Sequence, residues 1–234
     1  MTKIKTLVYF DLEATGLAGI GRPRIAEVSL VAMDSQCIYD LNVDIQNHLE
    51  KKKTRNNVFQ IETLLPRIIN KITLCVYPMT TVKPEVTDIT GLDNYNLVDQ
   101  TRFDENTAKL IIAFLAQLPP PICLVAHNGN LYDFPLLKAE LEKVNVQVSP
   151  DILCADSYLG FKSLYQTMQD RPKSFSLINL HKHLLGVFPT KSHGAEEDCL
   201  ALLRTTAAFG KDWLTWTENH HEKFSDCRKM WSWE

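Results

Sequence analysis

Two carboxylates two residues apart, Asp11 and Glu13, end the apolar run Thr6–Phe10 (TLVYF) near the start of the chain. Residues i and i+2 of an extended strand project from the same face, so both acids point one way and Leu12 points the other. Two carboxylates at the end of a buried strand repel each other and lose hydration unless a cation lies between them. Hard oxygen ligands of this kind suit Mg²⁺ or Mn²⁺ rather than zinc. By itself the pair is weak evidence for a metal site, because surface strand ends carry such pairs by chance.

A third carboxylate, Asp133, comes after another buried strand. It follows the turn-rich segment 127–132 (HNGNLY) and stands at the predicted start of a helix. Aspartate caps helices well, and a capping role is compatible with a role in metal binding.

His193 and Asp198 open the last long predicted helix. On a continuous helix their i, i+5 spacing separates them by about 140°. They converge only if His193 lies in the preceding loop, and Gly194 permits that bend. Glu196 and Glu197 are explained by the favourable interaction of negative charge with a helix N-terminus, so we assign them no catalytic role.

The elements that must position these groups follow from the pattern of apolar residues. Apolar runs predict strands at Thr6–Phe10, Ile25–Met33, Ile38–Ile45, Lys71–Tyr77, Ile122–Ala126 and Ile152–Ala155. Helical periodicity predicts helices at about residues 103–118, 134–144, 177–185 and 195–209. This order implies an α/β protein in one domain over residues 1–234, with a mixed sheet and helices on its faces.

Two further segments carry their own expectations. Residues 50–66, with the basic run 51–55 (KKKTR), are expected to form an exposed loop. The C-terminal segment 211–234 is rich in tryptophan, and we expect these side chains to dock on the core rather than remain exposed.

Charge gives a mixed indication about partners. The chain has 234 residues, 45% of them hydrophobic, and a net charge of −3, which argues mildly against a nucleic-acid partner. Bound metal neutralises acidic ligands, however, and basic residues outnumber acidic ones between residues 160 and 193. Lys162, Arg171 and Lys173 in this stretch are candidate phosphate contacts.

Composition also indicates the cellular compartment. The chain has no run of about eighteen apolar residues and no signal peptide, so we expect a soluble intracellular protein without membrane association. The six cysteines form no CxxC pair and are expected to be reduced thiols.

In combination these motifs resemble the DnaQ-like exonuclease superfamily in its histidine-bearing DEDDh subclass, and more closely the three-prime repair exonuclease (TREX) family. The resemblance covers about residues 6–210, and the ordered combination is highly specific. The matching segments are 10–17 (FDLEATGL), 74–76 (LCV), 89–92 (ITGL), 124–137 (LVAHNGNLYDFPLL), 173–177 (KSFSL) and 193–203.

The resemblance implies an RNase H-like fold and a two-metal 3′→5′ exonuclease that releases 5′-mononucleotides. It places Asp11 on both Mg²⁺ ions (Mn²⁺ can substitute), Glu13 and Asp198 on the ion beside the nucleophile, and Asp133 on the other. His193 is the implied general base. Paired metals suit this chemistry because they stabilise both the attacking and the leaving oxygen, and an imidazole suits proton abstraction near neutral pH.

The same resemblance implies substrate contacts. Glu13 and the backbone of Ala14 would bind the terminal 3′-hydroxyl, and Asp198 would also contact the substrate. The side chains implied to line the pocket for the last bases are Leu17, Ile89 and Tyr132. Stacking of this kind is largely blind to base identity and suits a frayed end.

Family likeness further implies a homodimer joined edge to edge, with residues 71–77 as the candidate edge strand. It implies the cytoplasm as compartment, with the nucleus as an alternative if the run 51–55 acts as a nuclear signal rather than as a solvated loop. Leu131 and Ala18 depart from the familiar pattern at positions that bear on duplex affinity more than on chemistry.

Two other functions remain open. An RNA exonuclease of the oligoribonuclease or RNase T type uses the same five residues, although the ITGL, KSFSL and YDFPLLKAEL matches favour DNA. A catalytically idle nucleic-acid-binding module would be expected to lose one or more ligands, and here all five residues are present.

Overall fold

A mixed sheet of six strands runs through the protein, for which a computed structural model describes residues 3–16, 21–54, 61–189 and 193–231. The strand order is β3-β2-β1-β4-β5-β6. Strand bounds are β1 Thr6–Ala14, β2 Ile25–Asp34, β3 Asn70–Cys75, β4 Ile122–Ala126, β5 Leu153–Asp156 and β6 Glu222–Lys223. The pairs β1–β4 and β4–β5 are parallel, whereas β1–β2, β2–β3 and β5–β6 are antiparallel. This is the mixed sheet that the sequence predicts, and β3 is an edge strand, as expected for residues 71–77.

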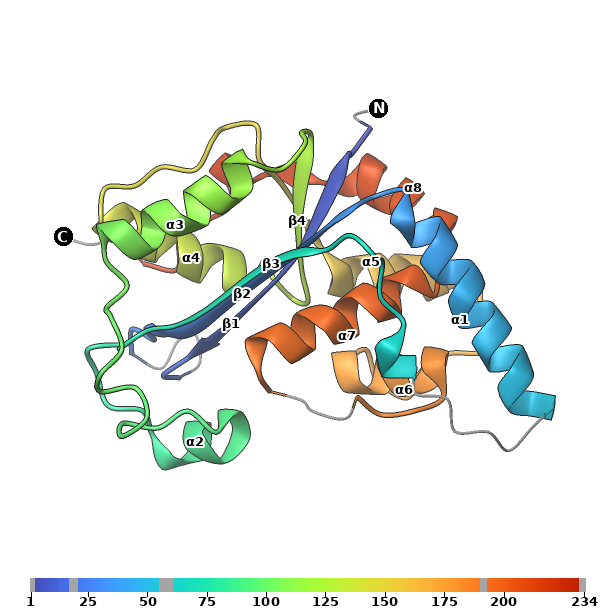
Figure 1. The fold of residues 1–234 in the computed structure, drawn as a ribbon, viewed down its shortest axis with the longest axis horizontal. Helices are drawn as coiled ribbons and strands as arrows, with labels where there is room; N and C mark the ends of the chain where they lie inside the picture. Colours follow the sequence, from blue (N-terminus) through green and yellow to red (C-terminus); the bar gives the residue numbers. More distant parts are fainter. Residues whose placement is uncertain (1–2, 17–20, 55–60, 190–192, 232–234) are drawn as a thin grey trace.

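Helices cover both faces of the sheet (Figure 1). One face carries α3 (Glu105–Ala116) and α4 (Asp133–Lys143). The other carries α1 (Cys37–Thr54), α5 (Ser157–Leu164), α6 (Leu177–Leu185), α7 (Ala195–Ala207) and α8 (Lys211–His220). The short helix α2 (Pro84–Thr90) lies beside the ends of β1 and β2, and 3₁₀ turns occupy Ile61–Thr63, Tyr165–Thr167 and Phe224–Asp226. The two larger hydrophobic clusters therefore lie on opposite faces of the sheet.

Alternation along β1 decides which helices its side chains meet. Phe10 and Leu12 pack in the cluster under α3 and α4, whereas Leu7 and Tyr9 pack in the cluster under α7. Because side chains alternate along a strand, the residues that continue the series of Tyr9 project toward the α7 face. Asp11 continues this series, and so does Glu13, two residues further on.

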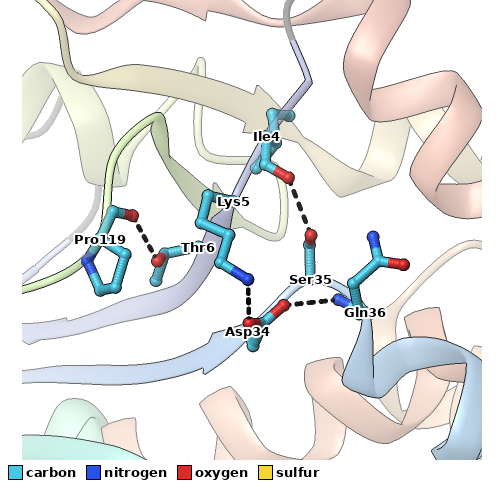
Figure 2. Close-up of polar contacts among 7 residues, drawn as sticks. All are labelled: Ile4, Lys5, Thr6, Asp34, Ser35, Gln36 and Pro119. Carbon is cyan, nitrogen blue, oxygen red and sulfur yellow. Dashed lines mark hydrogen bonds and ion pairs between the residues drawn. The ribbon is translucent and has the colours of Figure 1, made fainter.

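Polar contacts hold the start of β1 in register (Figure 2). The Thr6 hydroxyl donates to the Pro119 carbonyl at 2.6 Å, and the Ser35 hydroxyl donates to the Ile4 carbonyl at 2.8 Å. Lys5 forms an ion pair with Asp34 at the end of β2. These contacts lie at the opposite end of β1 from the acids, and a register fixed there also fixes which residues of β2 face the acids.

The predicted strand at residues 38–45 is wrong, because this segment belongs to the long helix α1. Ile38, Leu41 and Ile45 are all buried, whereas Val43 is 57% exposed. That spacing of three and four residues gives a helical stripe facing the core, which an eight-residue window does not distinguish from a buried strand. The helix also continues through residues 51–54, so the predicted loop is wrong for this part of the segment 50–66, and residues 55–60 lie outside the described residues.

The tryptophans near the C-terminus dock on the core, as predicted for those that the structure describes. Trp213 is fully buried and Trp216 is 8% exposed, both on α8. Gly160 on α5 permits this packing, because a Cβ at that position would approach Trp213 Cζ3 to 2.5 Å. Trp231 packs at the margin of the opposite cluster.

Candidate active site

Carboxylates from two elements meet at the carboxyl end of β1. Asp11 and Glu13 come from the last residues of the strand, and Asp198 comes from the first turn of α7. Ligand oxygens of these three residues all lie within 4.8 Å of one another. All three are only partly buried, so the cluster opens toward solvent at one side. An all-oxygen set of this kind could hold a divalent metal.

Asp133, the first residue of α4, faces the same cluster from the other side of β1. It is 5% exposed, and its carboxylate accepts a hydrogen bond from the backbone N–H of Leu12. That N–H is available because the pairing of β1 with β4 ends at Tyr9, before the acids begin. The shorter neighbouring strand thus opens the space that Asp133 enters.

A hydrogen-bonded turn before α4 sets the position of Asp133. Asn128 has a left-handed φ of 61°, and the carboxylate of Asp156 accepts the backbone N–H groups of Asn128 and Asn130 at 3.0 and 3.1 Å. The N–H of Phe134 then donates to the carbonyl of Gly129 at 3.0 Å. Asp156 at the end of β5 therefore ties the turn before α4 to the sheet.

The electrostatics of the cluster oppose full ionisation. Burial, followed by the charges of Asp133, Asp198, Glu13 and Glu27, raises the pKa of Asp11 well above its ordinary value. Burial and the charges of Asp198, Glu27 and Asp133 raise the pKa of Glu13 to about 8. The pKa values of Asp133 and Asp198 are also raised, chiefly by burial. A divalent cation would relieve this repulsion, so the charge pattern fits a metal site.

His193 lies in the loop before α7, as its spacing from Asp198 requires. Its φ of 70° is left-handed, and Gly194, which precedes the helix, is extended at φ −124° and ψ 134°. The carboxylate of Asp198 accepts the backbone N–H of His193, and the imidazole opposes the rise in the Asp198 pKa that burial causes. The side chain of His193 is exposed and therefore accessible to water.

A groove of ≈ 660 Å³ meets the acid cluster at Glu13. Four predicted site residues line it, namely Glu13, Ala14, Ile89 and Tyr132. The Tyr132 hydroxyl donates to the carbonyl of Gly16 across the groove. Ile89 is 55% exposed, so its apolar side chain is accessible from the groove. Leu17 lies outside the described residues.

The predicted phosphate contacts are not brought to this groove. Lys162, Arg171 and Lys173 are exposed, and none of them belongs to the described residues that line it. The guanidinium of Arg171 donates to the carbonyls of Met168 and Gln166 in its own loop.

Sequence reasoning missed several residues around the cluster. Arg22 and Lys83 line the groove, but isolated cations in loops give no signal in one sequence. Glu27 on β2 pairs with Glu13 across the sheet, directly before a β-bulge. An acid inside the apolar run 25–33 could have drawn attention to it, because such a residue is buried only with a partner.

Within the described residues, no helix is both long and apolar enough to span a bilayer.

Comparison with known proteins complements this geometry. A protein-family model described as exonuclease matches residues 8–206. Human three-prime repair exonuclease 1 is 36% identical over 97% of this chain and 71% of its own length. Mouse three prime repair exonuclease 2 is 30% identical over 98% of this chain and 94% of its own length.

Solved structures show the same architecture. A complex of Escherichia coli exonuclease I with single-stranded DNA superposes with a TM-score of 0.67 at 14% identity, covering 92% of this chain and 43% of that chain. At this identity the likeness concerns the fold, and it confirms the predicted RNase H-like class. Since the family model spans most of the chain and relatives match it over nearly its whole length, the chain belongs to the exonuclease family, in the three-prime repair branch, and is a 3′→5′ exonuclease.

Proposed function

We propose that this protein is a metal-dependent DNA exonuclease that removes 5′-mononucleotides from the 3′ ends of single-stranded or frayed duplex DNA. The observation that carries the proposal is the convergence of three carboxylates within 4.8 Å at the end of a groove of ≈ 660 Å³. The proposed unit of activity is the whole chain, residues 1–234, as one domain.

The acid cluster is the proposed site of two Mg²⁺ ions, for which Mn²⁺ can substitute. Its donors are all carboxylate oxygens, and their raised pKa values reflect burial and mutual repulsion that bound cations would relieve. We assign Asp11 to both ions, Glu13 and Asp198 to the ion beside the nucleophile, and Asp133 to the other. Such ions would supply electrostatic stabilisation of the attacking and leaving oxygens of phosphodiester hydrolysis.

His193 is the proposed general base. Its exposed imidazole is held next to Asp198 by the backbone contact between the two residues. From this position it accepts the proton of a water molecule that attacks the terminal phosphodiester. An acceptor at the end of a loop has solvent beside it, to which it can return the proton after each turnover.

The groove beside the cluster suits a frayed 3′ end. Glu13 and the backbone of Ala14 are assigned to the terminal 3′-hydroxyl, with Asp198 as a further substrate contact. Ile89 and Tyr132, together with Leu17, are assigned to the last bases. An apolar side chain and an aromatic ring in a groove favour stacking, which accepts any base.

DNA is the favoured substrate over RNA. Escherichia coli exonuclease I, which shares the fold, has been solved with single-stranded DNA and with the oligonucleotide dT13. The human and mouse relatives described above are named as repair exonucleases. Lys162 and Lys173 remain proposed contacts for phosphates farther along the strand, whereas Arg171 would first have to release its own loop carbonyls.

The proposed assembly is a homodimer joined through β3, and the proposed compartment is the cytoplasm, with the nucleus second. Within the part of the chain that the structure describes, β3 is an edge strand paired only with β2, and such an edge can pair with another copy. Light scattering should give twice the mass of the chain, and a monomeric mass would contradict the assembly.

The decisive experiment is the release of mononucleotides from 3′-labelled single-stranded DNA and matched RNA, each with Mg²⁺ and with EDTA. We expect rapid loss of DNA in Mg²⁺, no loss in EDTA and slower loss of RNA. Degradation of RNA alone would move the protein to the ribonuclease branch. Binding without cleavage of either substrate would indicate a catalytically idle module.

A further inference from the structure

Glu27 is a fifth carboxylate beside the cluster that the proposed mechanism does not use. It lies on β2 directly opposite Glu13. Its charge contributes, after burial and Asp198, to the raised pKa of Glu13. It is nevertheless absent from the described group of carboxylates within 4.8 Å of one another. An acid this close to other acids needs partners of its own, because its charge otherwise destabilises the site.

Both oxygens of Glu27 have such partners. One accepts the backbone N–H of Ala195 at 2.8 Å, and the other accepts the thiol of Cys75 at 3.5 Å. Ala195 is the first residue of α7, where a backbone N–H has no partner within the helix. Gly194 has no side chain to cap it, so Glu27 caps the helix from a strand 168 residues earlier.

A second contact ties the same helix turn to the sheet. Glu196 accepts hydrogen bonds from the side chains of Lys71 and Thr73 on β3, the latter at 2.9 Å. The side chains of Lys71 and Glu196 are 52% and 28% exposed, so water weakens this contact more than a buried one. The first turn of α7 is thus bonded to two neighbouring strands, β2 and β3. The bond from β2 is the one in which Glu27 accepts the backbone N–H of Ala195.

The capped turn directly precedes two residues of the proposed mechanism. Only Gly194 separates Ala195 from His193, and the extended Gly194 and left-handed His193 give the chain one defined path into the helix. Asp198 lies three residues beyond Ala195 and contacts the backbone of His193. Movement at Ala195 would therefore displace both the imidazole and a metal-binding carboxylate.

We propose that Glu27 is a positioning residue: by capping Ala195 it fixes the start of α7 and, with it, the direction in which His193 faces the attacked phosphodiester. This inference rests on the proposed role of His193 as general base. Glu27 is thus assigned a role through the backbone of Ala195 rather than through contact with the substrate. Small displacements of a catalytic group can lower turnover by about 10²-fold. Loss of the hydrogen bond between Glu27 and Ala195 should therefore lower kcat.

The test compares two substitutions that differ in their ability to accept a hydrogen bond. Glu27→Ala removes the acceptor, and we expect kcat for mononucleotide release to fall by roughly 10- to 100-fold with KM for DNA changed less than about threefold. Glu27→Gln keeps an amide oxygen for the Ala195 N–H, and we expect kcat within about threefold of wild type. Glu105→Ala, an exposed acid on α3, is the control for loss of a carboxylate elsewhere.

Ala195→Pro attacks the same contact from the other partner. Proline lacks the N–H, is tolerated at the first position of a helix, and requires an extended residue before it. Gly194, at φ −124° and ψ 134°, already has that conformation. We expect a loss of kcat similar to that of Glu27→Ala and no further loss when the two changes are combined.

The outcomes separate the inference from the function on which it rests. Normal kcat in Glu27→Ala, or equal losses in the Ala and Gln variants, would overturn the anchoring role. If Glu27→Ala does not fold by circular dichroism, normal kcat in folded Ala195→Pro overturns the role and reduced kcat supports it. Inactive wild-type protein, or near-normal kcat in His193→Ala, would instead refute the proposed function.

Discussion

Removal of divalent cations should make the fold progressively less stable from about pH 6.5 to 8.5, and Glu13→Gln should remove much of that loss. Burial and the charges of Asp198, Glu27 and Asp133 raise the pKa of Glu13 from 4.5 to about 8. A carboxyl whose pKa is higher in the folded chain contributes stability that is fully present below its unfolded value. That contribution is lost as the pH rises through the folded value, here near 8.

The magnitude follows from the two pKa values. Each unit is worth about 1.4 kcal/mol, and integration from about pH 6.5 to 8.5 gives a loss of roughly 2 kcal/mol in the free energy of unfolding from Glu13 alone. For a chain of this length, about 2–4 °C of Tm corresponds to 1 kcal/mol, so wild type should lose roughly 4–8 °C more than Glu13→Gln. His127, whose pKa burial lowers to about 4, is common to both proteins and cancels in the comparison.

Thermal unfolding monitored by intrinsic fluorescence, in EDTA and in Mg²⁺ across this pH range, provides the assay. In EDTA the Tm of wild type should fall more steeply with pH than that of Glu13→Gln. In Mg²⁺ the wild-type slope should flatten, because bound cations stabilise the ionised carboxylates. Equal slopes for both proteins in EDTA would refute the electrostatic account of the cluster.

Three further changes test other parts of the site and its support. Asp198→Asn should lower the rate of mononucleotide release by at least about 10²-fold while circular dichroism and Tm show an intact fold, and near-normal release would contradict its assignment to the metal. Tyr132→Phe removes the hydrogen bond to the Gly16 carbonyl, and a hydrogen bond of this kind contributes about 1 kcal/mol. We therefore expect KM for DNA to rise roughly fivefold. Unchanged steady-state kinetics would show that the bond is dispensable. Gly160→Ala forces a Cβ to within 2.5 Å of Trp213 and should cost about 1–3 kcal/mol in urea unfolding without altering kcat per folded molecule; undiminished stability would mean that α8 can shift.

The sequence identifies the parts of the site that local pattern decides. Asp11 and Glu13 share a face because a strand alternates, and the structure shows that face turned toward α7. His193 can approach Asp198 only from a loop, and its left-handed φ before an extended Gly194 supplies that loop. Each of these inferences needs only a few consecutive residues, so one sequence suffices.

Failures of prediction arise where short windows are ambiguous. The apolar side chains of residues 38–45 are compatible with the period of a strand and with that of a helix. In the structure Ile38, Leu41 and Ile45 are buried beside α7, which is the helical spacing. Helices α2, α5 and α8 were missed for a related reason. All three are short. Packing stabilises α5 and α8 more than intrinsic propensity does, as in the contact between Phe161 and Trp213, whose ring centroids lie 5.5 Å apart.

Glu27 escaped prediction for a different reason, which is topological. Its partner is the N–H of Ala195, and the two meet only because α7 packs against β1 and β2. Its proximity to Glu13 depends on the antiparallel register of the two strands, which the contacts at the far end of β1 help to set. Neither contact can be predicted from the spacing of neighbouring residues in the sequence.

The sheet explains how the chain tolerates an acid cluster that opposes its own folding. The first half of β1 is almost completely buried on both faces, with Leu7 through Phe10 at 0% exposure, and it provides the packing that fixes the strand. The second half extends beyond β4 and carries the carboxylates. The several kcal/mol of electrostatic cost expected at pH 8 is a large share of the roughly 5–15 kcal/mol that stabilises a typical domain. Metal binding should therefore contribute to the stability of this enzyme as well as to its chemistry. Loss of metal at alkaline pH should lower the stability and the activity together.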